Sequence, residues 1–462
     1  EQVALVLASG DLPDAFWGCG GGISQSILVQ YGVDDGTFVA LDELIQGAPN
    51  IVAAFNDANA WGSITQTDGH IYHIPQINVC QHCRVSAKMW YNGVWAEKLG
   101  IAMPTTTDEF YDMLVAFKTQ DPNGNGEADE IPLAGSTDGW HANVVEFLMN
   151  AFTYMDNDNR GFRITDGAAD NSALDPAFRD GIAYLRKLAD EGLLYLPSFS
   201  QTNDALKKLT EAEGGTLVGA VPAGFPGAIS NLGSDNCAQY RSVYPLKGPD
   251  GVVGCTSLPY FADRSGTFVI TDQCANPEAA MRVVNAAYTG EGRQRNHDGA
   301  EGIGWRWATE GEIGFNGKPA IWTSIRAYDG SIPQNSGFDQ CGPLYCSADW
   351  RAGQTTDTTI DLWSKDGNEY MLYVVTEQGY DPVRDDSRAW PPLSLTVDEN
   401  DTVAILRTEW DKFIQQSIYS FVSGEKDVAD DAVWDAFLAE ANACGIQEML
   451  EIYTTAYERQ YK

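Results

Sequence analysis

The chain has 462 residues, in which 65 Asp and Glu outnumber 29 Lys and Arg and leave a formal net charge of −36. A chain of this length is expected to divide into two or three domains, each with its own core. The acidic balance excludes nucleic acid and anionic lipid as partners, because phosphate binding requires clustered Lys and Arg. No apolar run is long enough to span a membrane.

The first residues, from Glu1 to Gly10, resemble the interior of a domain and carry no secretory leader. We expect a leader and a first strand–helix unit to be missing from the sequence. Hydrophobic patterns then alternate between strand and helix types, which favours an α/β fold with helices on the faces of its sheets. Strands are predicted at 71–74, 87–91 and 267–271, and helices at 107–117, from Pro176, from Pro277 and at 446–457.

The stretch that follows the first of these helices carries oxygen donors at alternate positions. Ca²⁺ takes about six to eight oxygens, and a calcium loop supplies side chains from positions one, three and five, a glycine at six and a carbonyl at seven. The residues at those positions are Asp121, Asn123, Asn125, Gly126 and Glu127.

The loop departs from the usual pattern at position twelve, where a bidentate Glu is replaced by Pro132. Coordination would therefore close early, through Asp129 and Glu130. A surface turn rich in Asp, Asn and Gly, which needs no ion, is the alternative. We favour a structural Ca²⁺, since three spaced Asx oxygens and a correctly placed glycine exceed what a turn requires. A sensor would need a second helix to move, and none is predicted there.

Nine cysteines are present, so at least one has no partner within a single chain. Cys80 and Cys83 enclose His82 in a pattern that resembles half of a zinc or redox site, but no second such pair follows at zinc spacing. We therefore favour a disulfide or two buried thiols. Cys341 and Cys346 are close enough in sequence to close a short loop.

The sequence offers little for catalysis. It has five His, and His70 and His73 are spaced so that they face opposite sides of a predicted strand. It lacks the metalloprotease, nucleophile-elbow, phosphate-loop and dinucleotide motifs. A pair of glycosidase carboxylates could still lie among the many acids, because such a pair is defined by its separation in space.

Several stretches resemble the family 1 extracellular solute-binding lipoproteins of ABC importers. They include Met89-Trp90-Tyr91-Asn92, residues 95–101 and residues 103–110. The loop 121–130, followed by Ile131-Pro132-Leu133, is similar to the calcium loop of large members that bind oligosaccharides, alginate-binding proteins among them. Further stretches agree in the same order and extend the resemblance over nearly the whole chain; they are 7–14, 68–75, 276–280, 421–427 and 452–459.

This resemblance implies an α/β, two-lobe periplasmic-binding-protein-like fold of type II, with a ligand cleft between the lobes. Residues 1–105 and 266–330 would form the N-terminal lobe, and 106–265 and 331–462 the C-terminal lobe. The implied calcium ligands are the side chains of Asp121, Asn123, Asn125, Asp129 and Glu130 and the carbonyl of Glu127. No family role is implied for Cys80 and Cys83.

The resemblance also implies a function without catalysis, in which a sugar is captured and handed to the permease of an ABC importer. Family precursors are anchored through a lipid, so we expect a monomeric cell-surface lipoprotein of a bacterium, extracellular or, in a Gram-negative cell, periplasmic. Two alternatives remain open. A carbohydrate-active enzyme would shorten the glycan, and a calcium-dependent surface adhesion module would bind without lobe closure.

An oligosaccharide needs flat aromatic faces for its C–H surfaces and polar side chains for its hydroxyls. Core packing is the alternative role for each aromatic candidate, because Trp is usually well buried. Trp90, Trp95, Trp410 and Trp434 lie in helix or strand patterns and are assigned to the core. The candidate ligand-binding residues are Asp14, Trp17, Arg84, Trp140, Phe225, Trp305, Trp307 and Trp350.

Overall fold

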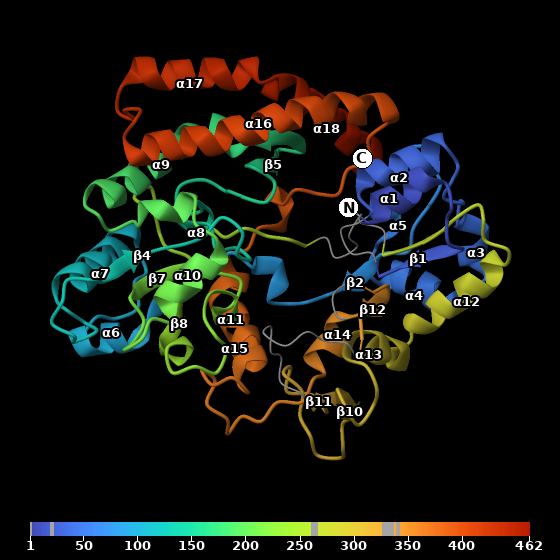
Figure 1. Cartoon of the computed structure of the whole chain (residues 1–462), viewed down its shortest axis with the longest axis horizontal. Helices are drawn as coiled ribbons and strands as arrows, with labels where there is room; N and C mark the ends of the chain where they lie inside the picture. The colour runs from blue at the N-terminus through green and yellow to red at the C-terminus, as the bar shows by residue number, and fades with distance from the viewer. Residues whose placement is uncertain (1, 19–22, 260–266, 326–336, 339–341) are drawn as a thin grey trace.

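The computed structural model describes residues 2–18, 23–259, 267–325, 337–338 and 342–462. Figure 1 shows two groups of elements side by side, with long C-terminal helices across the top of the view. Each group combines strands with helices, which is the α/β class predicted from the alternating pattern. Within the described ranges, no helix is both long enough and apolar enough to cross a membrane.

The larger group is built around a four-stranded sheet with strand order β4-β7-β3-β8. β4 and β7 run parallel, whereas β3 runs antiparallel to both β7 and β8. Every residue of β7 is buried, as expected for a strand covered on both faces. The four strands are β3 (Lys88–Asn92), β4 (Ile131–Leu133), β7 (Val218–Ala223) and β8 (Tyr240–Val243).

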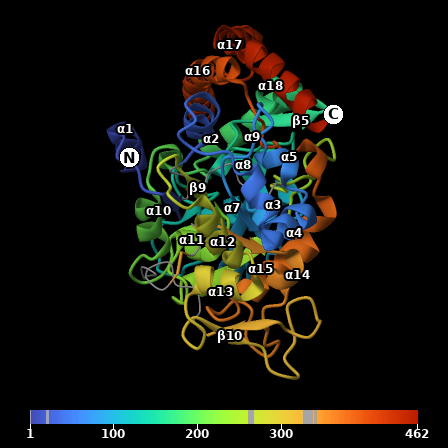
Figure 2. The ribbon, with the colours of Figure 1, turned by 90° about the vertical axis from the view of Figure 1, so that its right-hand side faces the viewer.

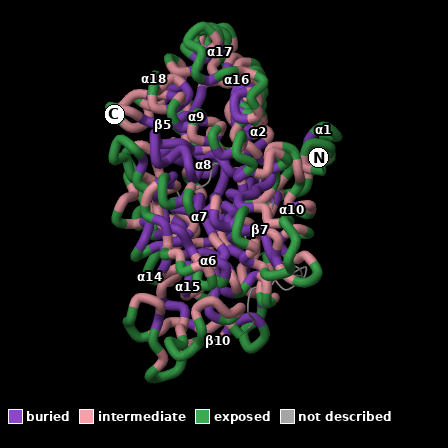
Figure 3. Tube along the Cα trace, turned by 90° about the vertical axis from the view of Figure 1, so that its left-hand side faces the viewer, coloured by how far each residue is buried: buried purple, intermediate pink, exposed green. Residues whose placement is uncertain are grey.

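Helices pack on this sheet and complete one large hydrophobic core, whose buried residues Figure 3 shows in the interior. Trp90, Trp95, Trp410 and Trp434 all lie in this core, which confirms their assignment from the sequence. The helices that contribute buried side chains are α6 (Gly93–Leu99), α7 (Thr107–Thr119), α8 (Val144–Met149), α9 (Pro176–Asp190), α10 (Asn203–Thr210), α11 (Pro226–Ile229), α15 (Asn368–Val375), α16 (Val397–Ser423), α17 (Asp431–Ala443) and α18 (Ile446–Tyr461).

Helix α7 begins where the sequence predicts and extends beyond residue 117, the predicted end, to Thr119. The hydroxyl of Thr106 accepts the N–H of Glu109 at 3.1 Å, and the carboxylate of Glu109 accepts the N–H of Thr105 at 2.8 Å. The first bond satisfies an amide that the first turn leaves without a helical partner, and the second ties the residue before the N-cap to the helix. The helix ends at Thr119, directly before the acidic loop 121–130.

The smaller group has a separate core and two short sheets, and Figure 2 shows its helices facing the viewer. A strand is predicted at 71–74, but there the structure has only an isolated bridge between Ile74 and Phe268. The strands are β1 (Ala15–Trp17), antiparallel to β9 (Phe268–Ile270), and β2 (Gln76–Asn78), parallel to β12 (Leu344–Cys346). The helices of this core are α3 (Asp42–Gln46), α4 (Pro49–Asp57), α5 (Trp61–Ile64) and α12 (Pro277–Ala287).

Other short elements lie beside the smaller core. Leu7 and Leu28, from two N-terminal helices, belong to a third hydrophobic cluster. A hairpin of β10 and β11 extends at the bottom of Figure 1. These elements are α1 (Gln2–Ser9), α2 (Gln25–Leu28), α13 (Gly290–Asp298), β10 (Trp305–Trp307), β11 (Trp322–Ser324) and α14 (Ala348–Ala352).

The segment 79–87 leads from β2 in the smaller core to β3 in the larger one. Residues 88–101, which the sequence analysis placed in the N-terminal lobe, contribute Trp90, Trp95 and Ala96 to the larger core. The division of the chain into lobes stays a prediction, and this packing favours a first boundary near Cys80 instead of residue 105.

The end of the chain makes a second connection between the cores. The amide of Gln460, in α18, donates to the carbonyl of Gly62 at 2.7 Å, and the hydroxyl of Ser394 donates to the carbonyl of Thr65 at 2.7 Å. Gly62 belongs to α5 of the smaller group, whereas α18 packs in the larger one.

Candidate functional site

The sheet topology brings several loops to one edge of the larger group. β4 and β7 are parallel, so the segments that follow them leave at the same edge. The antiparallel strand β3 begins there, because Lys88 pairs with Ala223 at the end of β7. Ligands of α/β proteins usually bind outside the carboxyl ends of parallel strands. The segment 79–87, which comes from the smaller core, enters β3 at this edge. The edge therefore lies between the two cores.

Trp140 follows β4 and meets Gly224, which follows β7. The carbonyl of Trp140 accepts the N–H of Gly224 at 3.0 Å. A Cβ atom at Gly224 would lie 2.2 Å from Cε3 of the indole, so only glycine leaves room for the ring. The ring of Phe225 is 6.0 Å away, and Trp140 remains 41% exposed. The supported, exposed indole is suited to stacking against a flat apolar ligand surface.

Trp17 lies at the end of β1 in the smaller group. It pairs with Phe268 in the strand ladder, and its ring contacts the rings of Phe268 at 5.7 Å and Phe338 at 6.0 Å. It is half-buried. Asp14 is exposed, and its carboxylate accepts the N–H of Ala275 at 3.1 Å. Asp14 therefore stabilises the turn after β9, whereas Trp17 offers part of its ring at the surface.

Arg84 lies on the segment between the cores and already has a carboxylate partner. Its Nη2 is 3.0 Å from Oδ2 and 3.2 Å from Oδ1 of Asp381. Gln81 donates to the same carboxylate at 3.2 Å, and the carbonyl of Arg84 accepts the N–H of Leu258. Arg84 thus joins three segments of the chain at the place where the two cores meet.

The three remaining candidates lie around the β10–β11 hairpin and differ in exposure. Trp305 is fully buried and its indole N–H donates to the carbonyl of Gly299 at 3.1 Å. Trp307 is 41% exposed and its ring is 6.0 Å from that of Trp350. The indole N–H of Trp350 donates to Gln294 at 3.1 Å. Because Trp305 has no exposed face, we do not retain it in the ligand set proposed below.

The acidic loop 121–130 folds around its own carboxylates. The two carboxylate oxygens of Asp121 accept the N–H groups of Gly124 and Gly126, at 2.9 and 3.2 Å. The amides of Asn123 and Asn125 both donate to Asp129, at 3.0 and 3.1 Å. Two of the predicted ligand side chains therefore converge on a third, Asp129, and Asp121 holds the turn.

Glu130 is the residue of this loop whose surroundings bear on a divalent cation. One of its carboxylate oxygens is buried and has no hydrogen-bond partner. Burial raises the pKa of Glu130, and the nearby carboxylates of Asp121 and Asp129 raise it further. A cation bound to these oxygens would remove the repulsion between the acids and complete the coordination of Glu130. The loop precedes β4 and Trp140 follows it, so the two lie at opposite ends of that strand.

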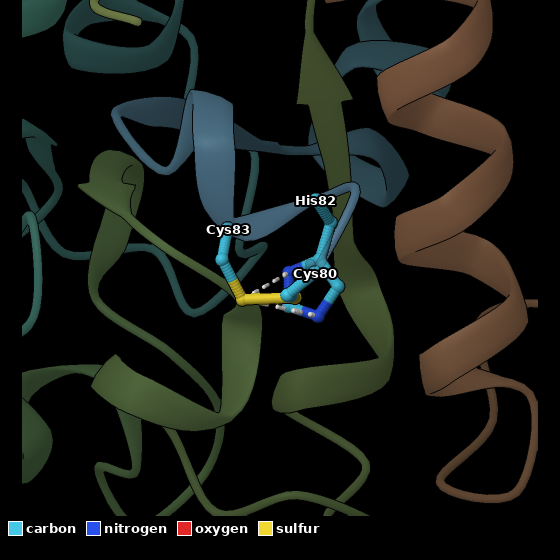
Figure 4. A group of neighbouring side chains, drawn as sticks. All are labelled: Cys80, His82 and Cys83. Atoms are coloured by element: carbon cyan, nitrogen blue, oxygen red, sulfur yellow. Dashed lines mark hydrogen bonds between the residues drawn. A yellow bond between two sulfur atoms is a disulfide. The ribbon is translucent and has the colours of Figure 1, made fainter. Parts of the chain in front are cut away.

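Cys80 and Cys83 form a disulfide, as favoured from the sequence, and Figure 4 shows His82 beside it. Both ring nitrogens of His82 lie 3.9 Å from Sγ of Cys83. This is the one group in the described part of the chain with three His, Cys, Asp or Glu ligand atoms within 4.8 Å of one another. Its sulfurs are joined in the disulfide and are not metal ligands in this state. Cys346 is a free thiol, and Cys341 lies outside the described residues.

Sequence reasoning missed His141 and Glu146, which lie directly behind Trp140. Nδ1 of His141 is 3.1 Å from Oε2 of Glu146, and both side chains are buried. His141 also has a left-handed backbone, with φ of 51°. A His and a Glu five residues apart, on either side of a helix start, match no known motif. The only signal in the sequence is that His141 is next to the candidate Trp140.

The described elements form the two-lobe, α/β fold of type II that several solved structures share. The chain belongs to the bacterial extracellular solute-binding protein family, whose model matches residues 1–294. It is similar to the fructooligosaccharide ABC transporter substrate-binding protein FusA of Streptococcus pneumoniae serotype 4, with 25% identity over 481 residues, 99% of this chain and 82% of that protein. It is also similar to lipoprotein LipO of Bacillus subtilis, with 25% identity over 54% of this chain and 48% of that protein.

Solved structures show the same fold over almost the whole chain. FusA in complex with kestose has a TM-score of 0.78 at 22% identity and covers 99% of this chain and 90% of its own. An HMO-binding, ABC-transporter-associated solute-binding protein from Bifidobacterium longum infantis has a TM-score of 0.80 at 21% identity and covers 99% of this chain and 89% of its own. The alginate-binding protein AlgQ2 without calcium ion has a TM-score of 0.65 at 21% identity, with coverage of 99% and 88%. The resemblance found in the sequence is thereby confirmed at the level of family and fold.

Proposed function

We propose that the chain is the substrate-binding protein of an ABC importer and that it captures an oligosaccharide between its two lobes. The observation that carries this proposal is the half-exposed indole of Trp140, supported by Gly224 at the edge that faces the other core. Similarity to FusA over 99% of the chain supports both the transporter and the oligosaccharide. The proposal includes no catalytic step, in keeping with relatives that are transporter components.

The proposed mechanism is selection of a closed state. Trp140 and Phe225 present aromatic surface on the larger lobe, and Trp17 does so at the end of β1 on the smaller one. A sugar that touches both lobes binds the closed arrangement more tightly than the open one, and so shifts the population toward it. The permease would then receive the closed, loaded form. Trp307 and Trp350 supply a further aromatic pair. Replacement of each by Ala would test whether the pair takes part in binding.

We assign Ca²⁺ a structural role in the loop 121–130. The unpartnered oxygen of Glu130 and the acids around it support an ion there. An EF-hand mutant of FusA and AlgQ2 without calcium ion, both similar in fold, add support. Ca²⁺ would stabilise the junction of α7 and β4. Attachment to the cell surface through a lipid on the precursor remains part of the proposal and fits a family of extracellular proteins that includes the similar lipoprotein LipO.

The deciding experiment is isothermal titration of the purified chain with a panel of oligosaccharides, with mass analysis of the sugar afterwards and small-angle scattering with and without it. We expect saturable binding, intact sugar and a more compact particle. Trp140→Ala should weaken binding at least tenfold, whereas Trp61→Phe, in α5, should not. Shortened sugar would favour the enzyme alternative. Binding without compaction would favour the adhesion module, and no binding across the panel would remove the sugar from the proposal.

A further inference from the structure

The peptide that carries Trp140 is held in an unfavourable conformation. The next residue, His141, has φ of 51°, in the left-handed region that non-glycine residues seldom adopt. Such a conformation persists when surrounding contacts over-determine it, and it is concentrated at functional sites. The contacts of His141 therefore bear on how Trp140 is presented.

The imidazole of His141 is buried against acids on two sides. Its Nδ1 lies 3.1 Å from Oε2 of Glu146, and the side chains of the two residues are 2% and 1% exposed. Its Nε2 lies 3.8 Å from Asp158. The second carboxylate oxygen of Glu146 accepts the N–H of Asn157 at 3.3 Å, which ties α8 to the following loop. A buried pair with these hydrogen bonds has little freedom to reorient.

The loop before His141 is held from the other side as well. The N–H of Ser136 donates to the carbonyl of Ala142 at 2.9 Å, and the N–H of Gly224 donates to the carbonyl of Trp140 at 3.0 Å. Trp140 is therefore flanked by Gly224 on β7's side and by the His141–Glu146 pair on α8's side. The rings of Trp140 and His141 are themselves in contact, with centroids 5.6 Å apart.

We propose that His141 and Glu146 are positioning residues of the ligand site, whose buried pair fixes the backbone at residue 141 and with it the orientation of the Trp140 ring over Gly224. This proposal rests on the proposed function, in which Trp140 contacts the sugar. Neither residue touches the ligand. Their effect on affinity comes through the ring that they orient.

The charges around the pair predict how it responds to pH. Burial opposes a charge on His141, but Glu146, Asp158 and Asp156 outweigh it and raise the pKa of the imidazole. Burial, reinforced by Glu146, raises the pKa of Asp156 to about 7. His141 and Arg160 counteract the rise that burial and Glu146 cause in the pKa of Asp158. Both shifts favour the proton-rich state, so their contribution to stability is greatest at mildly acidic pH and declines as pH rises through these pKa values.

The experiment compares Glu146→Gln and His141→Asn with the wild-type chain. We expect each variant to weaken the binding of the sugar identified by titration by about tenfold at pH 6 and to flatten the decline in affinity that the wild type shows above pH 7. His70→Asn is the matched control, because His70 and Asp42 form a pair of the same 3.1 Å length on an exposed surface of the smaller group. It should change neither affinity nor its pH profile.

A second readout separates orientation from folding. In protein labelled with 5-fluorotryptophan, the Trp140 resonance is assigned by its loss in Trp140→Phe. It should shift with pH in the wild type and shift less in Glu146→Gln, where only Asp156 still titrates in this range. An unaltered Trp140 resonance and unaltered affinity in Glu146→Gln would overturn the positioning role while leaving the proposed function intact. Unaltered affinity in Trp140→Ala would instead overturn the role of the ring on which both proposals depend.

Discussion

Nη2 of Arg84 lies 3.0 Å from Oδ2 of Asp381, although 297 residues separate the two along the chain. The side chains are 25% and 20% exposed, so the ion pair is largely shielded from water. Arg84 belongs to the segment that enters β3 from the smaller core, and Asp381 follows α15 of the larger one. The pair therefore stabilises the connection between the cores and not either core alone.

Asp381→Asn should lower the free energy of unfolding by about 2 kcal/mol, because it leaves a half-buried guanidinium without its charged partner. Chemical denaturation measures the change. Asp431→Asn is the matched control, since Asp431 is 89% exposed and pairs with Arg179 at 2.8 Å. That substitution should change stability by less than about 1 kcal/mol. Equal losses in the two variants would contradict a special role for Asp381.

Addition of Ca²⁺ should raise the thermal unfolding midpoint of the wild-type chain, because an ion that binds only the folded state stabilises it by mass action. Glu130→Gln should remove most of this rise. Glu127→Gln should retain it, since only the carbonyl of Glu127 is assigned to the ion. A midpoint that does not respond to Ca²⁺ or chelator would favour the plain surface turn.

The affinity for Ca²⁺ should fall as pH is lowered toward the raised pKa of Glu130. In the ion-free chain, burial and neighbouring acids favour the protonated carboxyl, so a proton competes with the cation. The ion-free fold correspondingly gains stability as this group is protonated, and the benefit of Ca²⁺ is greatest above that pKa. Calorimetric titrations with Ca²⁺ at several pH values measure both the affinity and the protons released.

Gly224→Ala should weaken sugar binding and lower stability, because its Cβ would meet the six-membered ring of Trp140 at 2.2 Å and displace it. Gly62→Ala is the control, since a Cβ at Gly62 meets no atom within 4 Å. Titration and thermal unfolding of the two variants provide the test. Wild-type affinity in Gly224→Ala would show that the position of the ring does not govern binding.

Replacement of Cys83 by Ser should leave the fold intact and lower the free energy of unfolding by about 2 kcal/mol or less, because the disulfide closes a loop with a sequence separation of only 3. Zn²⁺ should not stabilise the oxidised protein, since both sulfurs are bonded to each other. Denaturation with and without Zn²⁺ tests both statements, and a Zn²⁺-dependent rise in the oxidised chain would contradict the second.

The features that local chemistry controls were predictable from the sequence. The spacing of Thr106 and Glu109 predicts the start of α7, and the periodic patterns around Trp90 and Trp410 predict their burial. The fold class and family followed from alternating elements and from stretches spread along the chain. The start of α7 and the burial of the two tryptophans are signalled within a few residues of the feature, which is the range over which caps and hydrophobic periods act.

Features that depend on distant partners were not predictable. The glycine-rich sequence around Trp305 predicts an exposed loop residue. In the structure the side chain is fully buried, and its indole N–H donates to the carbonyl of Gly299. No Pro-, Gly- or Ser-rich linker marks the beginning of residues 88–101. Only the packing of the folded chain shows that they belong to the larger core. The pairing of His141 with Glu146 could not be predicted, because it depends on the conformation of the turn between Trp140 and α8.

The hydrogen bonds of Gln460 to Gly62 and of Ser394 to Thr65 give the chain a joint that is independent of the segments passing between its cores. Two bodies joined at two separate places rotate most easily about the line through both joints. If the lobes close on a sugar as proposed, the axis of that rotation would pass near Arg84 and Gln460. In that proposal the two lobes separate most at aromatic rings far from the axis, so a glycan long enough to span them would distinguish the closed arrangement from the open one most strongly.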